Sequence, residues 1–100
     1  MNITLDINGS SMKAELVGRL DTTTAPQLEA ELASKLDGIT ELTLDFDNLA
    51  YISSAGLRVL LMCQKKMNAT NGKMVVKNPN ELVMAVFEAT GFSDILTIEQ

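Results

Sequence analysis

Segments with two different apolar periods alternate along this chain, and this alternation restricts the fold more than any other feature. Residues 3–7 and 42–46 carry apolar side chains at every second position, which is typical of a strand with one buried face. Leu28, Leu32 and Leu36 are instead spaced four apart, which is typical of an amphipathic helix. Strands that alternate with helices favour a sheet with helices packed against it.

The full pattern predicts the order β-β-α-β-α-β-α-β. The predicted elements are strands over 3–7 and 12–17 with a turn between them, a helix over 25–36, a strand over 42–46, a helix from Ser53–Gly56 to Met67, a strand over 73–77, a helix over 81–89 and a strand over 95–98. Residues 47–50 are predicted as a loop, and a Thr before Pro26 as a helix cap. We therefore predict an α/β fold with a mixed sheet of four to five strands, in one domain over residues 1–100.

Charge and cysteine content exclude several classes of protein. The chain has 8 basic and 13 acidic side chains, a net charge of −5, and its cations form no stripe, so we expect no nucleic-acid partner. Cys63 is the single cysteine and lies in an apolar helical pattern, which indicates a buried hydrophobic residue and no internal disulfide. The sequence has no signal peptide and no apolar run of about 20 residues, so we expect a soluble, cytoplasmic protein without membrane insertion.

The residue types that support catalysis or metal binding are scarce. Histidine is absent, which removes the commonest general base and a common metal ligand, and no phosphate-binding glycine motif occurs. We expect no enzyme activity, cofactor or metal. Asp45 and Asp47 could form a carboxylate pair, but Asp45 at the polar face or end of a strand and Asp47 in a turn is the favoured interpretation.

Ser54 precedes Ala55 and Gly56 between a predicted strand and a predicted helix. This resembles part of the G-x-S-x-G nucleophile elbow, but Ile52 replaces the first glycine and no histidine could activate the hydroxyl, so a serine hydrolase is disfavoured. Two interpretations remain. Ser53 or Ser54 could be only an N-cap, or Ser54 could accept a phosphate beside the unpaired N–H groups of the helix.

These residues resemble the STAS domain family, named for sulfate transporters and anti-sigma-factor antagonists. The resemblance covers nearly the whole chain. It is carried by Gly18-Arg19-Leu20-Asp21, Leu44-Asp45-Phe46, the block Tyr51-Ile52-Ser53-Ser54-Ala55-Gly56-Leu57-Arg58-Val59-Leu60-Leu61, and Gly91-Phe92.

The resemblance to antagonists of this type implies that the chain is a switch protein. The resemblance implies that the unphosphorylated chain binds an anti-sigma factor that is itself a serine kinase and so frees a sigma factor. Phosphorylation by that kinase breaks the complex, and a PP2C-type phosphatase resets it. By position, the phosphoacceptor falls on Ser54. Many antagonists carry Asp immediately before the acceptor, whereas this chain has Ser53, which leaves Ser53 as an alternative acceptor.

The implied partner surface combines the loop around Asp21 with the start of the second helix. Its predicted residues are Asp21, Thr22, Ser53, Ser54, Ala55, Gly56, Arg58 and Met62. Met62 lies on one helical stripe with Ala55, Arg58 and Lys65, where it either contacts a partner or touches a neighbouring helix. We expect a monomer or a weak dimer. The alternative function is a STAS scaffold subunit, transporter-associated or signalling, that works without a phosphoswitch.

Overall fold

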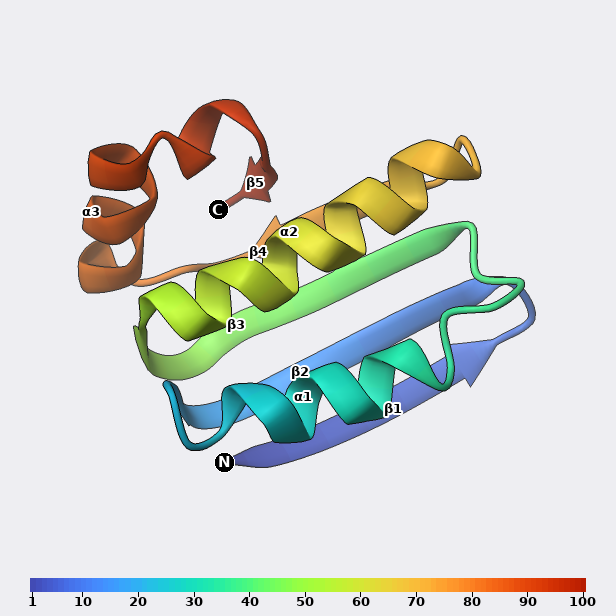
Figure 1. Cartoon of the computed structure of the whole chain (residues 1–100), viewed down its shortest axis with the longest axis horizontal. Helices are drawn as coiled ribbons and strands as arrows, with labels where there is room; N and C mark the ends of the chain where they lie inside the picture. Colours follow the sequence, from blue (N-terminus) through green and yellow to red (C-terminus); the bar gives the residue numbers. More distant parts are fainter.

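A five-stranded mixed sheet forms the base of the molecule in the computed structural model, which describes residues 1–100. The strand order is β1-β2-β3-β4-β5, with β1 antiparallel to β2 and all other neighbours parallel. The strands are β1 (Asn2–Asn8), β2 (Ser11–Leu20), β3 (Glu41–Ile52), β4 (Lys73–Lys77) and β5 (Thr97–Glu99) (Figure 1). The predicted mixed sheet and the predicted order of elements are confirmed.

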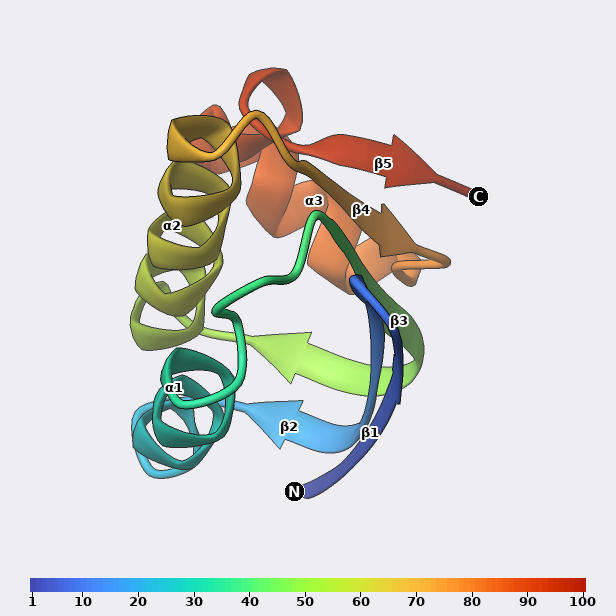
Figure 2. The same ribbon diagram turned by 90° about the vertical axis from the view of Figure 1, so that its right-hand side faces the viewer.

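Three helices cover one face of this sheet (Figure 2). They are α1 (Ala25–Ala33), α2 (Ser54–Ala69) and α3 (Glu81–Thr90), and a short 3-10 helix, η1 (Phe92–Asp94), follows α3. The strands show why only one face is covered, because buried residues alternate with exposed or half-buried ones over residues 11–16 of β2 and 41–46 of β3. The other face of the sheet is open to solvent.

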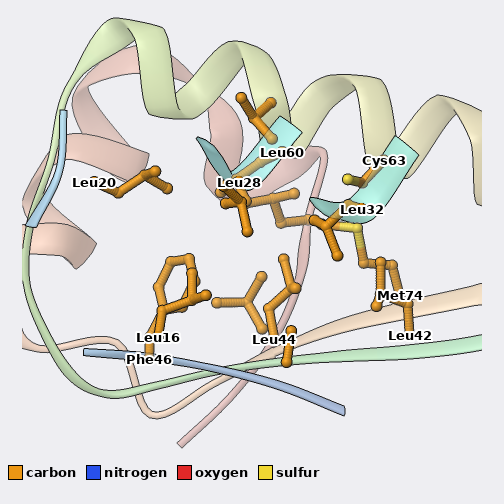
Figure 3. Close-up of a cluster of buried hydrophobic side chains, with 14 of the residues drawn as sticks. Leu16, Leu20, Leu28, Leu32, Leu42, Leu44, Phe46, Leu60, Cys63 and Met74 are labelled. Carbon is orange, nitrogen blue, oxygen red and sulfur yellow. The ribbon is translucent and has the colours of Figure 1, made fainter. Parts of the chain in front are cut away.

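The core lies between the sheet and the helices. Leu16, Leu44 and Phe46 point up from the strands toward Leu28 and Leu60 of the helices (Figure 3). Each buried side chain of this kind contributes about 1.5 to 3 kcal/mol. The ring of Phe46 also lies 6.3 Å from that of Phe87, which joins α3 to the same core.

Cys63 belongs to this core, as predicted. It is fully buried, and burial raises the pKa of its thiol to about 11. A thiol with so high a pKa is almost entirely protonated at neutral pH, so Cys63 packs as a small apolar residue rather than as a nucleophile.

Strand β3 differs from the prediction, because residues 47–50 belong to the strand and form no loop. Two register shifts against β2, one between Glu15 and Val17 and one between Gly18 and Arg19, accommodate them. β3 has 12 residues and β2 has 10, and the difference of two equals one extra residue at each shift. Bulges of this kind bend a strand and increase its twist. The polar pair at 47–48 therefore marks a bend within a strand.

Other predicted boundaries are wrong too. Strand β2 does not end at Val17 but continues to Leu20. Helix α1 ends at Ala33, although Leu36 beyond it is still buried. The last strand occupies Thr97–Glu99 and not residues 95–98, because the chain first turns through η1. Helix α3 follows the prediction, with Asn80 as its N-cap and Gly91 as its C-cap.

Candidate functional site

The end of β2 and the start of α2 lie side by side at one end of the sheet, at the left of Figure 1. Leu20 and Ile52 are register partners at the ends of β2 and β3, and the N–H of Ser53 donates to the carbonyl oxygen of Leu20 at 2.9 Å. The loop that begins with Asp21 is thereby held beside the first turn of α2.

The two serines have different positions in this first turn. Ser53 is the N-cap of α2, in an extended conformation, and its hydroxyl accepts a hydrogen bond from the N–H of Gly56 at 3.4 Å. Ser54 is the first residue of the helix and is exposed. Because Ser53 performs the capping, the Ser54 hydroxyl is free of that role. Asp also caps helices well, so the Ser found here in place of Asp retains the cap and removes a charge.

Gly56 lies beneath this surface. It is buried, and a Cβ at its position would lie 2.8 Å from both Ile52 Cγ1 and Leu20 Cγ, closer than real Cβ atoms approach. The absence of a side chain therefore lets α2 start directly against the ends of β2 and β3. Gly56 therefore fixes the positions of Ser53 and Ser54 at the start of α2.

Asp21 organises the loop that faces α2. Its Oδ1 accepts hydrogen bonds from the N–H and hydroxyl of Thr23 and from the N–H of Thr24. The Thr23 hydroxyl, which donates at 2.8 Å, is the main reason that the pKa of Asp21 is lowered from its ordinary value of 3.8.

The predicted Thr cap of α1 is wrong. Thr24 occupies the N-cap position, but its hydroxyl accepts from the N–H of Asp21 and donates to the carbonyl oxygen of Arg19, both at 2.8 Å. This hydroxyl is used to close the loop, and Pro26 at the start of α1 has no N–H group that needs an acceptor.

A shallow groove between α1 and α2 brings several of the predicted residues together. Thr22, Ala55 and Arg58 line it, and its volume is about 200 Å³. Its other lining residues are Ala25, Pro26, Glu29 and Val59. We call Asp21, Thr22, Ser54, Ala55 and Arg58 the candidate surface. Met62 is outside the groove lining, half-buried, and packs against the core.

Arg19 and Glu29 flank the candidate surface and were missed by the sequence analysis. The Arg19 guanidinium lies 4.6 Å from the centre of the Tyr51 ring, and its Nε is 3.7 Å from Asp21 Oδ2. Because Arg19 belongs to the Gly18–Asp21 motif, the sequence did contain a feature that could have identified it. Glu29 could be found only once the packing of α1 on α2 was known.

Asp45 and Asp47 lie away from the candidate surface, in the middle of β3. Asp45 is on the open face, where Lys13 Nζ is 3.7 Å from Oδ2, while its Oδ1 accepts from the N–H of Asp47 at 3.0 Å. The interpretation of Asp45 as a residue of the polar face is confirmed. Asp47 in a turn is wrong, because it lies in β3 beside the first register shift.

The arrangement offers a contact surface with an exposed hydroxyl and charges of both signs. No three His, Cys, Asp or Glu side chains are grouped to hold a metal ion. No helix is long and apolar enough to cross a membrane. What the candidate surface can do chemically is bind, and accept a group on Ser54.

Comparisons with known proteins agree with this description. The family model for the Mlab STAS domain matches residues 3–97. A putative anti-sigma factor antagonist, BtrV of Bordetella bronchiseptica, is 39% identical over 99 residues, covering 98% of this chain and 85% of BtrV. Among solved structures, a putative antagonist from Thermotoga maritima has a TM-score of 0.91 at 19% identity and covers 98% of this chain and 86% of that one.

The phosphorylated form of the Bacillus cell fate determinant SpoIIAA also has this fold. Its TM-score is 0.78 at 20% identity, and the match covers 99% of this chain and 92% of that chain.

The fold and the candidate surface thus define a small α/β binding module. The chain belongs to the STAS domain family, in its anti-sigma factor antagonist group. Members of this group are binding proteins and not enzymes, which confirms the prediction of a protein without enzyme activity.

Proposed function

We propose that this chain, a single STAS domain over residues 1–100, binds an anti-sigma factor that is a serine kinase, and that phosphorylation of Ser54 ends the binding. The main support for this proposal is that the two serines have different roles, because Ser53 caps α2 while Ser54 is exposed in its first turn. A hydroxyl at this place can be modified without loss of the cap. The name of BtrV, a putative anti-sigma factor antagonist, supports the same role.

The proposed contact area is the candidate surface together with Ser53 and Met62. Asp21 and Arg58 supply charges, Thr22 and Ala55 line the groove between the helices, and Gly56 beneath them fixes the helix start. A phosphate on Ser54 adds close to two negative charges in the middle of this area. It disturbs a partner fitted to a neutral hydroxyl, while the N-terminus of α2 tolerates it locally.

The remaining parts of the proposal concern the cellular cycle. A PP2C-type phosphatase resets the chain, and the freed sigma factor acts in transcription. We propose that the protein acts in the cytoplasm, needs no cofactor, and contacts neither nucleic acid nor membrane. The phosphatase and the sigma factor follow from family membership, and the other statements follow from the charge and composition of the chain. Each stays a prediction.

The test uses the serine kinase that co-purifies with the tagged chain. With ATP it should add one phosphate to the wild-type chain and none to Ser54→Ala, and Ser54→Asp should bind the kinase more weakly. Ser53→Ala tests the alternative acceptor, because it removes the neighbouring hydroxyl and leaves Ser54 in place, so this chain should still gain one phosphate. Full modification of Ser54→Ala would show that the site is wrong.

A STAS scaffold subunit without a phosphoswitch is the alternative. It predicts a partner that is not a kinase and binding that Ser54→Asp leaves intact. The same pull-down, repeated with Ser54→Asp and followed by identification of the captured protein, separates the two functions.

A further inference from the structure

Strand β1 is an open edge of the sheet (Figure 1). It spans seven residues, pairs only with β2, and shows no register shift along its length. Its three apolar side chains, Ile3, Leu5 and Ile7, all belong to the helix-covered face, yet none is fully buried, and Ile7 is 48% exposed. Sheet edges are usually protected by bulges, proline or lysine. Asp6 is the one charged residue of β1, and its side chain is on the other face.

The backbone hydrogen bonds of β1 follow from the hairpin that it forms with β2. Asn8 pairs with Ser11 across the two-residue turn Gly9–Ser10. A two-residue turn makes the closing pair a hydrogen-bonded one, and hydrogen-bonded pairs alternate along an antiparallel ladder. The residues whose N–H and C=O groups point away from β2 are therefore Ile3, Leu5 and Ile7.

These three residues can be satisfied together by an identical strand. In an antiparallel pairing with a two-fold axis at Leu5, Leu5 faces Leu5 of the second copy, and Ile3 faces its Ile7. Three pairs that each exchange two hydrogen bonds give about six bonds between the chains. All seven residues of β1 are paired, since Leu5 is the middle residue of Asn2–Asn8.

Charge favours the same register. With the axis at Leu5, Asp6 faces Thr4 of the second copy. A shift that places the axis at Asp6 would set two carboxylates opposite each other, which is destabilising. In this register, the apolar side chains of Ile3, Leu5 and Ile7 face only apolar side chains of the second copy.

We propose that β1 is a self-association edge through which two copies of this chain join, antiparallel about Leu5, into one continuous sheet. The candidate surface lies at the end of the sheet where β1 begins, because Asn2 pairs with Val17 near the end of β2. In the dimer, the two candidate surfaces lie at opposite ends and both stay accessible. The proposal does not depend on the proposed function.

The first test measures association by sedimentation between about 10 µM and 1 mM. The wild-type chain should show a reversible monomer–dimer equilibrium, and Ile7→Lys should raise the dissociation constant at least about tenfold, since a lysine is placed on the edge at a pairing position. Leu82→Lys is the matched control, because Leu82 is 53% exposed on α3 and should leave the equilibrium unchanged. A wild-type chain that stays monomeric over this range, or an equal effect of both variants, would overturn the proposal.

The second test fixes the register by mild oxidation. The Cα atoms of a hydrogen-bonded antiparallel pair are about 5.5 Å apart, which is within the range of a disulfide. Leu5→Cys should therefore form a covalent dimer, while Thr4→Cys should not, and the buried Cys63 should take no part. Cross-linking of Thr4→Cys without that of Leu5→Cys would overturn the register, and capture of a foreign extended peptide in place of a second copy would overturn the occupant.

Discussion

Ser53 is held to Leu20 by a backbone hydrogen bond of 2.9 Å, and this bond joins the two segments that form the candidate surface. Ser53 also accepts from the N–H of Gly56, so that it is fixed on both sides. Ser54 shares neither of these contacts and is exposed. The pair of serines therefore separates a structural role from one that is open to chemistry.

Replacement of the two serines should affect stability unequally. Ser53→Ala removes the side-chain cap of α2 and should lower the free energy of unfolding by about 1 kcal/mol. Ser54→Ala removes an exposed hydroxyl and should change it by no more than about 0.5 kcal/mol. Urea denaturation of both variants measures the difference. Equal losses would mean that the cap is shared or lies on Ser54.

Gly56→Ala should destabilise the protein although alanine is the better helix former. Propensity alone predicts a gain of up to about 1 kcal/mol at a helical glycine. The new Cβ would meet Ile52, Leu20 Cγ and the Leu20 carbonyl oxygen at 2.8 to 3.0 Å, and overpacking of this kind costs about 1 to 3 kcal/mol. We expect a net loss in urea denaturation, and a more stable Gly56→Ala would contradict the close packing of α2 on β2.

The elements that could be predicted were those whose own residues carry the pattern. Period-two alternation located β1 and the first part of β3, and Asn80 and Gly91 gave the bounds of α3. The continuation of β3 through residues 47–50 could not be predicted, because Asp47-Asn48 has the composition of a turn. Contacts from a distant segment stabilise it instead, since Asn80 Nδ2 donates to the carbonyl oxygens of Leu49 and Ala50 at 3.1 and 3.3 Å.

The site was predictable to a similar extent. The motif located Ser54 and Asp21, but whether Ser53 or Ser54 caps the helix depends on where α2 begins, within one residue. That boundary is set by Gly56, whose lack of a side chain lets the helix start against Leu20. The position of Glu29 in the groove depends on how α1 packs on α2, which no local pattern specifies.

The acidity of Asp21 should depend on the hydroxyl of Thr23. The folded-state pKa lies below the ordinary value of 3.8, so the contribution of Asp21 to stability is complete above that value and is lost as pH falls through the lowered one. Thr23→Val removes the main cause and should raise the pKa of Asp21 toward 3.8. NMR titration of the Asp21 carboxyl carbon measures this change.

Thr22→Val is the matched control for that titration. Thr22 is exposed, and the hydrogen bonds to the Asp21 carboxylate come from Thr23 and Thr24. Its replacement should leave the titration of Asp21 where it is in the wild type. If Thr23→Val titrates like Thr22→Val, the hydroxyl contact is not what lowers the pKa.

A phosphate on Ser54 should interact with Arg58, which is four residues further along α2. Residues four apart are neighbours on a helix surface, and both side chains are exposed. An exposed ion pair contributes about 0.2 to 1 kcal/mol, so Arg58→Ala should raise the midpoint of the second phosphate ionisation, measured by ³¹P NMR on the phosphorylated chain, by about 0.2 to 0.7 pH unit.

Glu29, on the other side of the groove, provides a test of the direction in which the phosphate midpoint shifts. Glu29 lines the same groove as Arg58, and removal of its charge by Glu29→Gln should lower the phosphate midpoint, because a like charge is removed. Lys65→Ala, also exposed on α2 but seven residues beyond Arg58, should leave it unchanged. If Lys65→Ala raised the midpoint as much as Arg58→Ala, the phosphate would be responding to net charge alone. Opposite shifts for Arg58 and Glu29, with none for Lys65, require the phosphate to lie at the mouth of the groove, where a partner fitted to the unmodified candidate surface would meet it directly.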